Sequence, residues 1–140
     1  MADEPCFADW LAITQVKAAY CRLLDTKDWQ GWGDLFTPDV VVDVTDSGGS
    51  VMEGRAALVA SVSASLAAAK TAHQVHFPEI HIDGDQATAI WPMQDRVEWE
   101  GRALTGFGHY HERYVRQDGR WRIAAQRLTR LAMNFDGAQS

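Results

Sequence analysis

The stretch Thr71-Ala-His-Gln-Val-His-Phe-Pro-Glu79 lies where the chain changes from helical spacing to strand alternation. From here on, the sequence consists of long alternating segments separated by short turns that contain glycine. Such segments are typical of strands in an antiparallel meander. Strands of this length must twist, so we expect a curved sheet. The strands are predicted over residues 73–82, 87–99, 104–116 and 121–133.

The part of the chain that precedes this stretch has mainly helical patterns. Apolar residues recur at helical spacing in the first segment, where Asp9 is the expected N-cap. Helices that precede a sheet in the sequence indicate an α+β fold. We expect three N-terminal helices on a cone-shaped, curved mixed or antiparallel sheet, which together enclose a pocket. The helices are predicted over residues 8–24, 29–36 and 53–69, with a turn at 37–39 and a strand over 40–44.

The size and charge of the chain narrow the possible functions. Its 140 residues favour a single domain over 1–140, with a core over about residues 7–133. The net charge of −6 argues against nucleic acid and anionic membrane surfaces as partners, because both require a basic footprint. No apolar run approaches the roughly 20 residues that span a bilayer, and the first residues lack the features of a signal peptide. We therefore expect a cytoplasmic protein.

Two of the predicted strands carry charged residues on their inner faces. Strand alternation places Asp95 among apolar side chains, on the same face as Trp91. A buried carboxylate is costly, so Asp95 requires a partner or a raised pKa unless a bulge turns it outward. In the last strand, alternation places Arg127 inward, and Arg130 is inward only if a bulge shifts the register. We predict that Asp95, Arg127 and Trp91 line the pocket.

Three further side chains suit proton transfer without a cofactor: the imidazole of His73, the carboxylate of Asp25 and the phenol of Tyr20. His73 and His76 lie on opposite strand faces, and His73 is the better pocket candidate because it shares its face with apolar residues. Tyr20 and Asp25 lie about 140° apart on an ideal helix, so both face one pocket only if the helix ends near Leu24. Core packing, capping and surface charge are the structural alternatives for these residues.

A histidine pair in the third long strand raises the question of a metal site. His109 and His111 flank Tyr110, and a His-x-His pair on a strand can chelate a metal ion. A third ligand is missing from the local sequence, and there is no glycine-rich phosphate loop followed by a helix. We therefore expect neither a metal ion nor another cofactor.

These features together resemble the SnoaL-like group of the nuclear-transport-factor-2-like superfamily. The resemblance covers roughly residues 7–133 and depends on element order and on local signatures. The most specific of these are Tyr20-Cys-Arg-Leu-Leu-Asp-Thr-Lys-Asp-Trp29, Leu35-Phe-Thr-Pro-Asp-Val40 and the helix start at Gly54-Arg55. They indicate the superfamily and do not specify one reaction.

Within this group, the spacing of Tyr20, Asp25, His73 and Asp95 resembles the branch of bile-acid dehydratase, scytalone dehydratase and hexachlorocyclohexane dehydrochlorinase. The resemblance implies an Asp25–His73 dyad in which His73 removes a proton and Asp25 fixes its tautomer. It implies that Tyr20 assists the departing hydroxyl or polarises a carbonyl. Asp95 and an arginine of the last strand match secondary pocket positions, and a second histidine of the branch matches either His109 or His111.

The implied function is a cofactor-independent lyase acting on a small cyclic apolar substrate such as a polyketide or a steroid. We place His109 with the substrate-binding residues on this resemblance. An isomerase or cyclase that uses the same proton transfers is an alternative, and a noncatalytic domain that binds a small ligand is another. The superfamily resemblance also implies a homodimer or homotrimer.

Overall fold

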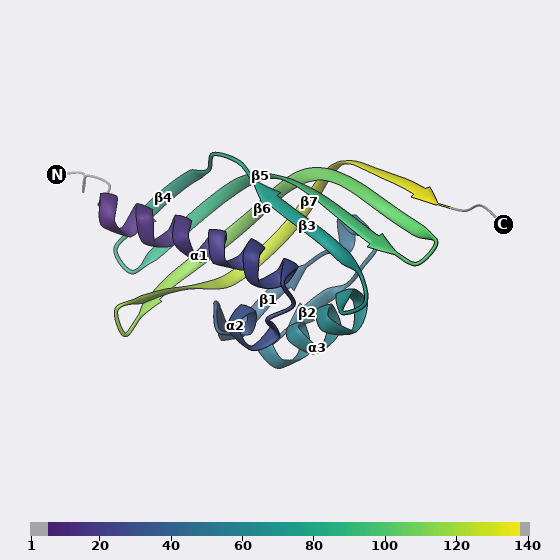
Figure 1. Ribbon diagram of the computed structural model, residues 1–140. Coiled ribbons are helices and arrows are strands. Elements are labelled where there is room, and N and C mark those ends of the chain that lie inside the picture. Colours follow the sequence, from purple (N-terminus) through teal and green to yellow (C-terminus); the bar gives the residue numbers. More distant parts are fainter. Residues whose placement is uncertain (1–5, 138–140) are drawn as a thin grey trace.

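The computed structural model describes residues 6–137, in which seven strands form one curved sheet (Figure 1). The strand order is β2-β1-β7-β6-β5-β3, and β4 also pairs with β5. The pairing of β1 with β7 is parallel and all others are antiparallel, so the sheet is mixed. The strands are β1 (Phe36–Asp43), β2 (Val51–Glu53), β3 (Lys70–Val75), β4 (Glu79–Asp83), β5 (Gln86–Trp99), β6 (Arg102–Gln117) and β7 (Arg120–Gly137).

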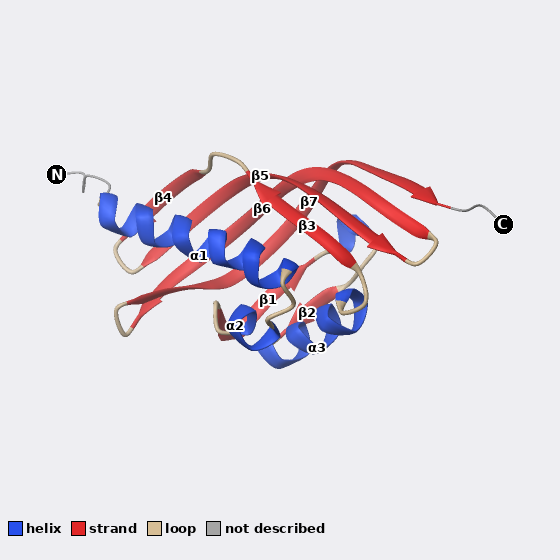
Figure 2. Ribbon diagram, in the orientation of Figure 1, coloured by secondary structure: helices blue, strands red, loops and turns tan. Residues whose placement is uncertain are grey.

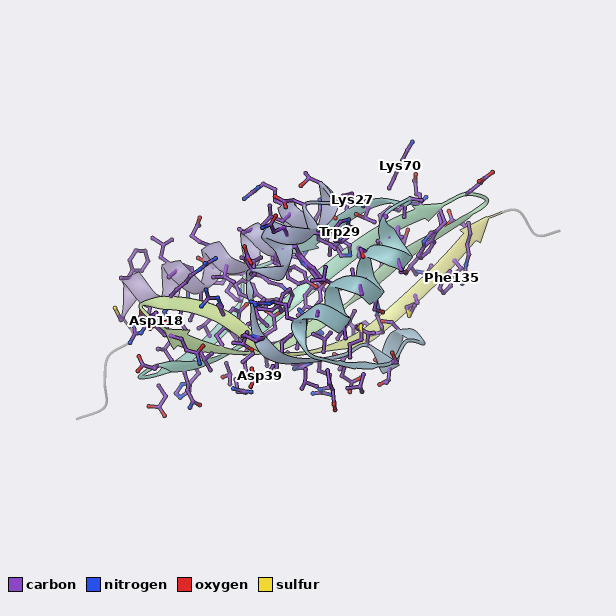
Figure 3. The ribbon with its side chains drawn as sticks, turned by 90° about the horizontal axis from the view of Figure 1, so that it is seen from below. Lys27, Trp29, Asp39, Lys70, Asp118 and Phe135 are labelled. Atoms are coloured by element: carbon purple, nitrogen blue, oxygen red, sulfur yellow. The ribbon has the colours of Figure 1, made fainter. Side chains whose placement is uncertain are left out.

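Three α-helices lie against this sheet, as Figure 2 shows. They are α1 (Phe7–Asp25), α2 (Trp29–Gly33) and α3 (Arg55–Leu66), and a short 3₁₀ turn, η1 (Thr45–Ser47), connects β1 to β2. The view from below shows the long axis of the sheet, with Asp118 in the β6–β7 turn at one end and Phe135 of β7 at the other (Figure 3). The expected α+β fold with a curved sheet and three helices is confirmed. No helix in the described part of the chain is long and apolar enough to cross a membrane.

The first helix, α1, buries one face and has a different N-cap from the predicted one. Its buried residues are Ile13, Lys17, Tyr20 and Leu24, which follow one another at spacings of three or four. The N-cap is Cys6, so the expectation that Asp9 caps the helix is wrong. Asp9 lies in the first turn, where its carboxylate accepts hydrogen bonds from side chains of the distant β6–β7 hairpin.

Several element boundaries differ from the predicted ones. The predicted strand 73–82 is two strands, because three residues between β3 and β4 face only Trp91 and Pro92 on β5. The connection between β3 and β4 therefore has one residue more than the facing part of β5, as in a β-bulge. Pro78 lies in this connection and cannot donate a ladder hydrogen bond. The turn expected at 37–39 lies inside β1, where the register shifts between Phe36 and Val41. The second and third helices end earlier than predicted.

The inner face of the sheet forms most of the core. Alternate residues of β5 and of β6 are buried, as the sequence pattern predicts for β5. Trp91, which we expected in the ligand pocket, is 3% exposed and packs in this core. Several core residues, among them Tyr20, Leu58 and Tyr110, also line a cavity on the concave face of the sheet.

Candidate active site

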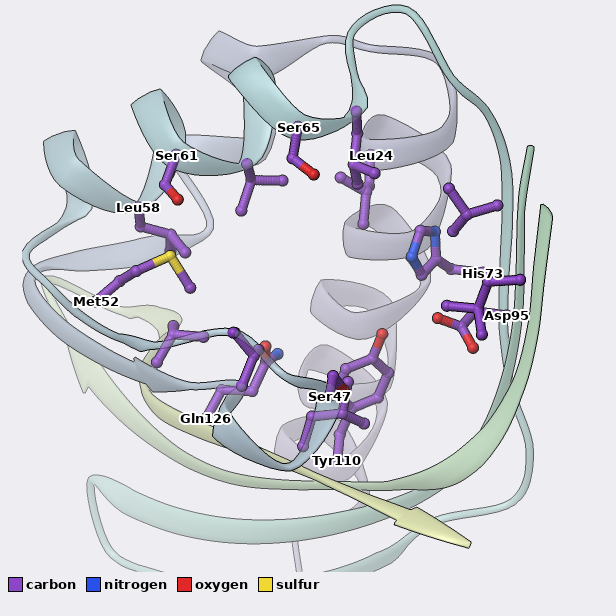
Figure 4. A pocket seen from close by; sticks show the side chains of 18 of the residues that line it. Leu24, Ser47, Met52, Leu58, Ser61, Ser65, His73, Asp95, Tyr110 and Gln126 are labelled. Atoms are coloured by element: carbon purple, nitrogen blue, oxygen red, sulfur yellow. The ribbon is translucent and has the colours of Figure 1, made fainter. Parts of the chain in front are cut away.

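A cavity of about 420 Å³ lies between the concave face of the sheet, the end of α1 and α3. This volume falls in the range of pockets that bind small molecules. Most of its wall is apolar, from residues such as Leu24, Val42, Met52 and Leu58. A smaller number of polar groups face it, and Figure 4 shows several of them from close by. The polar residues are Tyr20, Ser47, Ser50, Ser61, Ser65, His73, Asp95, Arg102, Tyr110, Gln126 and Arg130.

The side chain of His73 lies on this wall in contact with Asp25. Its Nδ1 is 2.7 Å from Oδ1 of Asp25, and its side chain is 7% exposed. Figure 4 shows the imidazole of His73 directed into the cavity. The sequence brings the two residues together because α1 ends at Asp25 and β3 runs past that end. An ionised carboxylate can only accept, so Nδ1 carries the hydrogen and Nε2 keeps a free lone pair.

Asp25 is held by more than the imidazole. The backbone N–H of His73 donates to Oδ2 at 2.8 Å, and the Thr71 hydroxyl donates to Oδ1 at 2.9 Å. Lys27, which has a left-handed backbone conformation after the helix end, donates to the Thr71 hydroxyl. Partial burial raises the pKa of Asp25, but the hydrogen bonds from His73 and Thr71 outweigh it, and the pKa is lower than usual. Asp25 therefore remains a carboxylate.

A second pair of charges lies on the cavity wall beyond His73. Nη1 and Nη2 of Arg130 donate to the two carboxylate oxygens of Asp95 at 2.7 and 3.0 Å. Both side chains are at least nine-tenths buried, so the bidentate geometry compensates for their desolvation. The Ser47 hydroxyl accepts from Nε of Arg130, which fixes the guanidinium against η1. His73 and Asp95 face each other across the β3–β5 ladder, which places this pair next to the imidazole.

The prediction that Arg127 lines the pocket is wrong, because Arg127 is exposed and Arg130 takes this place. A register shift in β7 explains the difference, because Ala124 has no partner on β6; a second shift, at Leu131, follows Arg130. Each extra residue reverses which side chains face inward. The inner face is therefore made by odd-numbered residues up to Ile123 and by even-numbered residues from Gln126 to Arg130.

Gly106 of β6 makes room for the charge pair. It lies opposite Asp95 on β5, and a Cβ atom there would overlap both Arg130 Nη1 and Asp95 Oδ1. These two atoms are bonded to each other, and the guanidinium of Arg130 is also held by Ser47 of η1. The absence of a side chain at this position is thus a requirement of the site.

The floor of the cavity is made by two phenols, Tyr20 and Tyr110, whose ring centroids are 5.7 Å apart. The ammonium group of Lys17 lies 3.6 Å from the centroid of each ring. This lysine is completely buried and is paired with Glu112 at 2.8 Å. Burial, and then the charge of Glu112, raises the pKa of Tyr20, so its phenol stays protonated.

The predicted residue His109 does not reach the cavity. Tyr110 points inward from β6, so His109 and His111 lie on the opposite face of the sheet. His111 is bonded to the Thr129 hydroxyl on that face. The described residues contain no group of three or more side chains that could hold a metal ion.

Sequence reasoning missed the importance of several residues of the cavity floor. Tyr110 could have been found by treating Leu104, Tyr110 and Tyr114 as one buried strand face. Lys17 could have been found because it lies in the apolar stripe of α1, where a lysine is unusual. Its partner Glu112 and the neighbouring Gln126 carry no comparable local signal.

The fold and the cavity define a small α+β domain of the cone type, with polar groups gathered on one side of an apolar pocket. The family model described as "SnoaL-like domain" matches residues 7–127. The chain therefore belongs to the SnoaL-like domain family, which has the nuclear-transport-factor-2-like fold.

Solved structures agree with this assignment. A single-substitution variant of Rv3472, a protein of unknown function from Mycobacterium tuberculosis, is 30% identical; the match covers 89% of this chain and 77% of that one, with a TM-score of 0.79. A type 2 hexachlorocyclohexane dehydrochlorinase (LinA) is 14% identical over 95% and 92% of the chains, with a TM-score of 0.83. An NTF2-like protein with a cystatin-like fold from Novosphingobium aromaticivorans is 23% identical over 89% and 83%, with a TM-score of 0.77. The last two show similarity of fold alone.

Proposed function

We propose that this protein is a cofactor-independent lyase that eliminates water or another leaving group from a small cyclic apolar substrate, such as a polyketide or a steroid. The observation that carries this proposal is the contact of 2.7 Å between Asp25 and His73, with the imidazole on the wall of an apolar cavity. A histidine whose Nδ1 is bound by a carboxylate presents a basic Nε2 to a ligand.

The reaction would begin when Nε2 of His73 takes a proton from a substrate carbon. The electrons of that C–H bond form the new double bond, and the leaving group departs with its bonding electrons. Asp25 stabilises the imidazolium that results, since it is already ionised and bound to Nδ1. A phenol of the cavity floor, which the sequence predicts to be Tyr20, donates a hydrogen bond to the departing oxygen. When the leaving group is a hydroxyl, the proton taken up by His73 is returned to it, so water leaves and the imidazole is neutral again.

The remainder of the cavity supports the proposed substrate class. Leu24, Val42 and Leu58 offer apolar contact to a ring system, and a volume of about 420 Å³ accommodates a compact cyclic molecule. The Asp95–Arg130 pair is the charged group on the wall beside His73. We propose that it contacts an oxygen of the substrate, in the role that the sequence predicts for Asp95 and an arginine.

The experiment is a screen of cyclic β-hydroxyketones, in which elimination is followed by the absorbance of the conjugated enone. His73→Ala and Asp25→Asn should each lower turnover by about 10²–10⁴-fold, the usual contribution of a positioned acid–base group. His76→Ala is the matched control, because His76 is exposed three residues along the chain and does not line the cavity. Full activity of both variants, with unchanged circular dichroism, would refute the proposed dyad.

Product analysis separates the alternatives that start with the same proton abstraction. An isomerase or cyclase would exchange the substrate proton for deuterium in D₂O and return a product of unchanged composition. A noncatalytic binding domain would bind the ketones without exchange. Loss of water together with His73-dependent exchange is the result expected for a lyase.

A further inference from the structure

The buried carboxylate of Glu112, below the cavity floor, fixes the direction of the hydrogen bonds that run from Tyr20 through Gln126 to Glu112. Glu112 of β6 is 4% exposed. It accepts from Lys17 Nζ at 2.8 Å, from the Tyr114 hydroxyl at 2.6 Å and from Gln126 Nε2 at 2.5 Å. Three donors, one of them charged, compensate for burial of a carboxylate.

The orientation of the Gln126 amide follows from this arrangement. Since an ionised carboxylate only accepts, the amide must direct its NH₂ group at Glu112 and its Oε1 away. Oε1 lies 3.4 Å from the Tyr20 hydroxyl, and an amide oxygen also only accepts. The hydroxyl hydrogen of Tyr20 is therefore directed at Gln126, and not at a ligand in the cavity.

Tyr110 is the other phenol of the floor, and among the described residues the acceptor beside its hydroxyl is the Tyr20 hydroxyl, not an amide or a carboxylate. Its side chain is 2% exposed and points into the cavity from β6 (Figure 4). The Tyr20 hydroxyl is itself committed to Gln126, and the Tyr110 hydroxyl is not among the fully enclosed polar atoms that lack a partner. Its hydrogen can therefore turn toward an oxygen that enters the cavity.

Lys17 strengthens both phenols as donors. Its ammonium group lies 3.6 Å from the centroids of the Tyr20 and Tyr110 rings, in a position that no solvent reaches. A cation over an aromatic face withdraws electron density from the ring, and burial makes this interaction stronger than at a surface. Negative charge that develops on an oxygen bound to Tyr110 is therefore stabilised through the ring.

We propose that Tyr110 is a further catalytic residue, which donates the hydrogen bond to a substrate oxygen, whereas Tyr20 is a positioning residue held by Gln126 and Glu112. This inference rests on the proposed function and refines it. It defines the substrates as cyclic molecules with a carbonyl or hydroxyl oxygen that gains negative charge when His73 removes the neighbouring proton.

The test uses 4-nitrophenol as a small cyclic probe, whose absorbance reports the charge on its bound oxygen. Tyr110→Phe should weaken binding of the probe by about tenfold or more, as loss of a hydrogen bond to a charged group does. Tyr20→Phe should weaken it by less than about threefold. In a Gln126→Leu background the Tyr20 hydrogen is released, so Tyr20→Phe should then cost more and Tyr110→Phe less.

His109→Ala is the control, because His109 is next to Tyr110 on β6 but lies on the opposite face, outside the cavity lining. Its affinity for the probe should stay within about threefold of the wild type. The inference is overturned if Tyr20→Phe weakens binding as much as Tyr110→Phe does, or if the wild-type protein does not bind the probe. Enone formation distinguishes the two proposals: if the wild-type protein binds the probe but forms no enone from any of the β-hydroxyketones, the lyase is refuted and the probe result stands.

Discussion

At the scale of single residues, Asp25 is a carboxylate at the end of α1 that hydrogen bonds keep ionised. Three donors hold its two oxygens, and two of them belong to His73. The backbone N–H of His73 and the Thr71 hydroxyl hold the carboxylate in place, so rotation of the imidazole would break its bond to Asp25. In the proposed reaction the carboxylate thus orients the base and stabilises the imidazolium by its charge.

The lowered pKa of Asp25 predicts a specific dependence of stability on pH. A group with a lowered folded pKa stabilises the protein above its unfolded pKa, ordinarily 3.8, and this stabilisation is lost as pH falls through the folded value. Asp25→Asn should therefore lower the free energy of unfolding by about 1–2 kcal/mol at pH 7, as loss of hydrogen bonds to a charged group does. The difference from the wild type should shrink below pH 4, as measured by urea unfolding.

Asp39→Asn provides the comparison, because Asp39 is exposed and its side chain makes no hydrogen bond among the described residues. Its unfolding free energy should follow that of the wild type at every pH. A difference between wild type and Asp25→Asn that stays constant from pH 7 to pH 2.5 would show that the Asp25 contacts do not depend on its charge.

At the scale of elements, the strands differ in how well sequence alone predicts them. Alternation in β5 predicts the buried face on which Asp95 lies, because that strand pairs with β6 without a shift. Alternation in β7 fails, because Ala124 and Leu131 are unpaired and neither residue type signals a bulge. The choice between Arg127 and Arg130 therefore depends on pairing with β6, which local sequence does not contain.

The close approach of β5, β6 and β7 at the charge pair gives a second prediction. Gly106→Ala places a methyl group where Arg130 and Asp95 meet, so the pair must separate inside the protein. Breaking a buried ion pair costs about 3–5 kcal/mol, and we expect a loss of this size in the free energy of unfolding. Thermal and urea unfolding of the purified variant measure it, and enone formation should fall as well.

His109→Ala is the control on the same strand, since His109 is half-buried on the opposite face. Its stability should change by no more than about 1 kcal/mol, and its turnover should remain that of the wild type. If Gly106→Ala is as stable as His109→Ala, the Asp95–Arg130 pair has room to shift and does not constrain β6.

At the scale of the whole molecule, the order of elements was the most predictable property. Helices first and long strands afterwards indicate the α+β class, and the signatures at 20–29 and 35–40 indicate the family. The long-range contacts of the cavity floor were not predictable, since Lys17 of α1 and Glu112 of β6 meet only when α1 lies across the curved sheet. Long-range contacts of this kind follow from the twist of the sheet, and no local pattern encodes them.

The outward face of the sheet leads to the last prediction, a homodimer or homotrimer. Val41, Phe107 and Leu131 are 40%, 38% and 74% exposed on β1, β6 and β7, and exposed apolar side chains on neighbouring strands favour association. Light scattering after size exclusion should give two or three times the chain mass of 15.6 kDa. Leu131→Asp should shift the mass toward the monomer, whereas Phe77→Asp, at the exposed turn between β3 and β4, should not. A wild-type monomer at micromolar concentration would contradict the prediction.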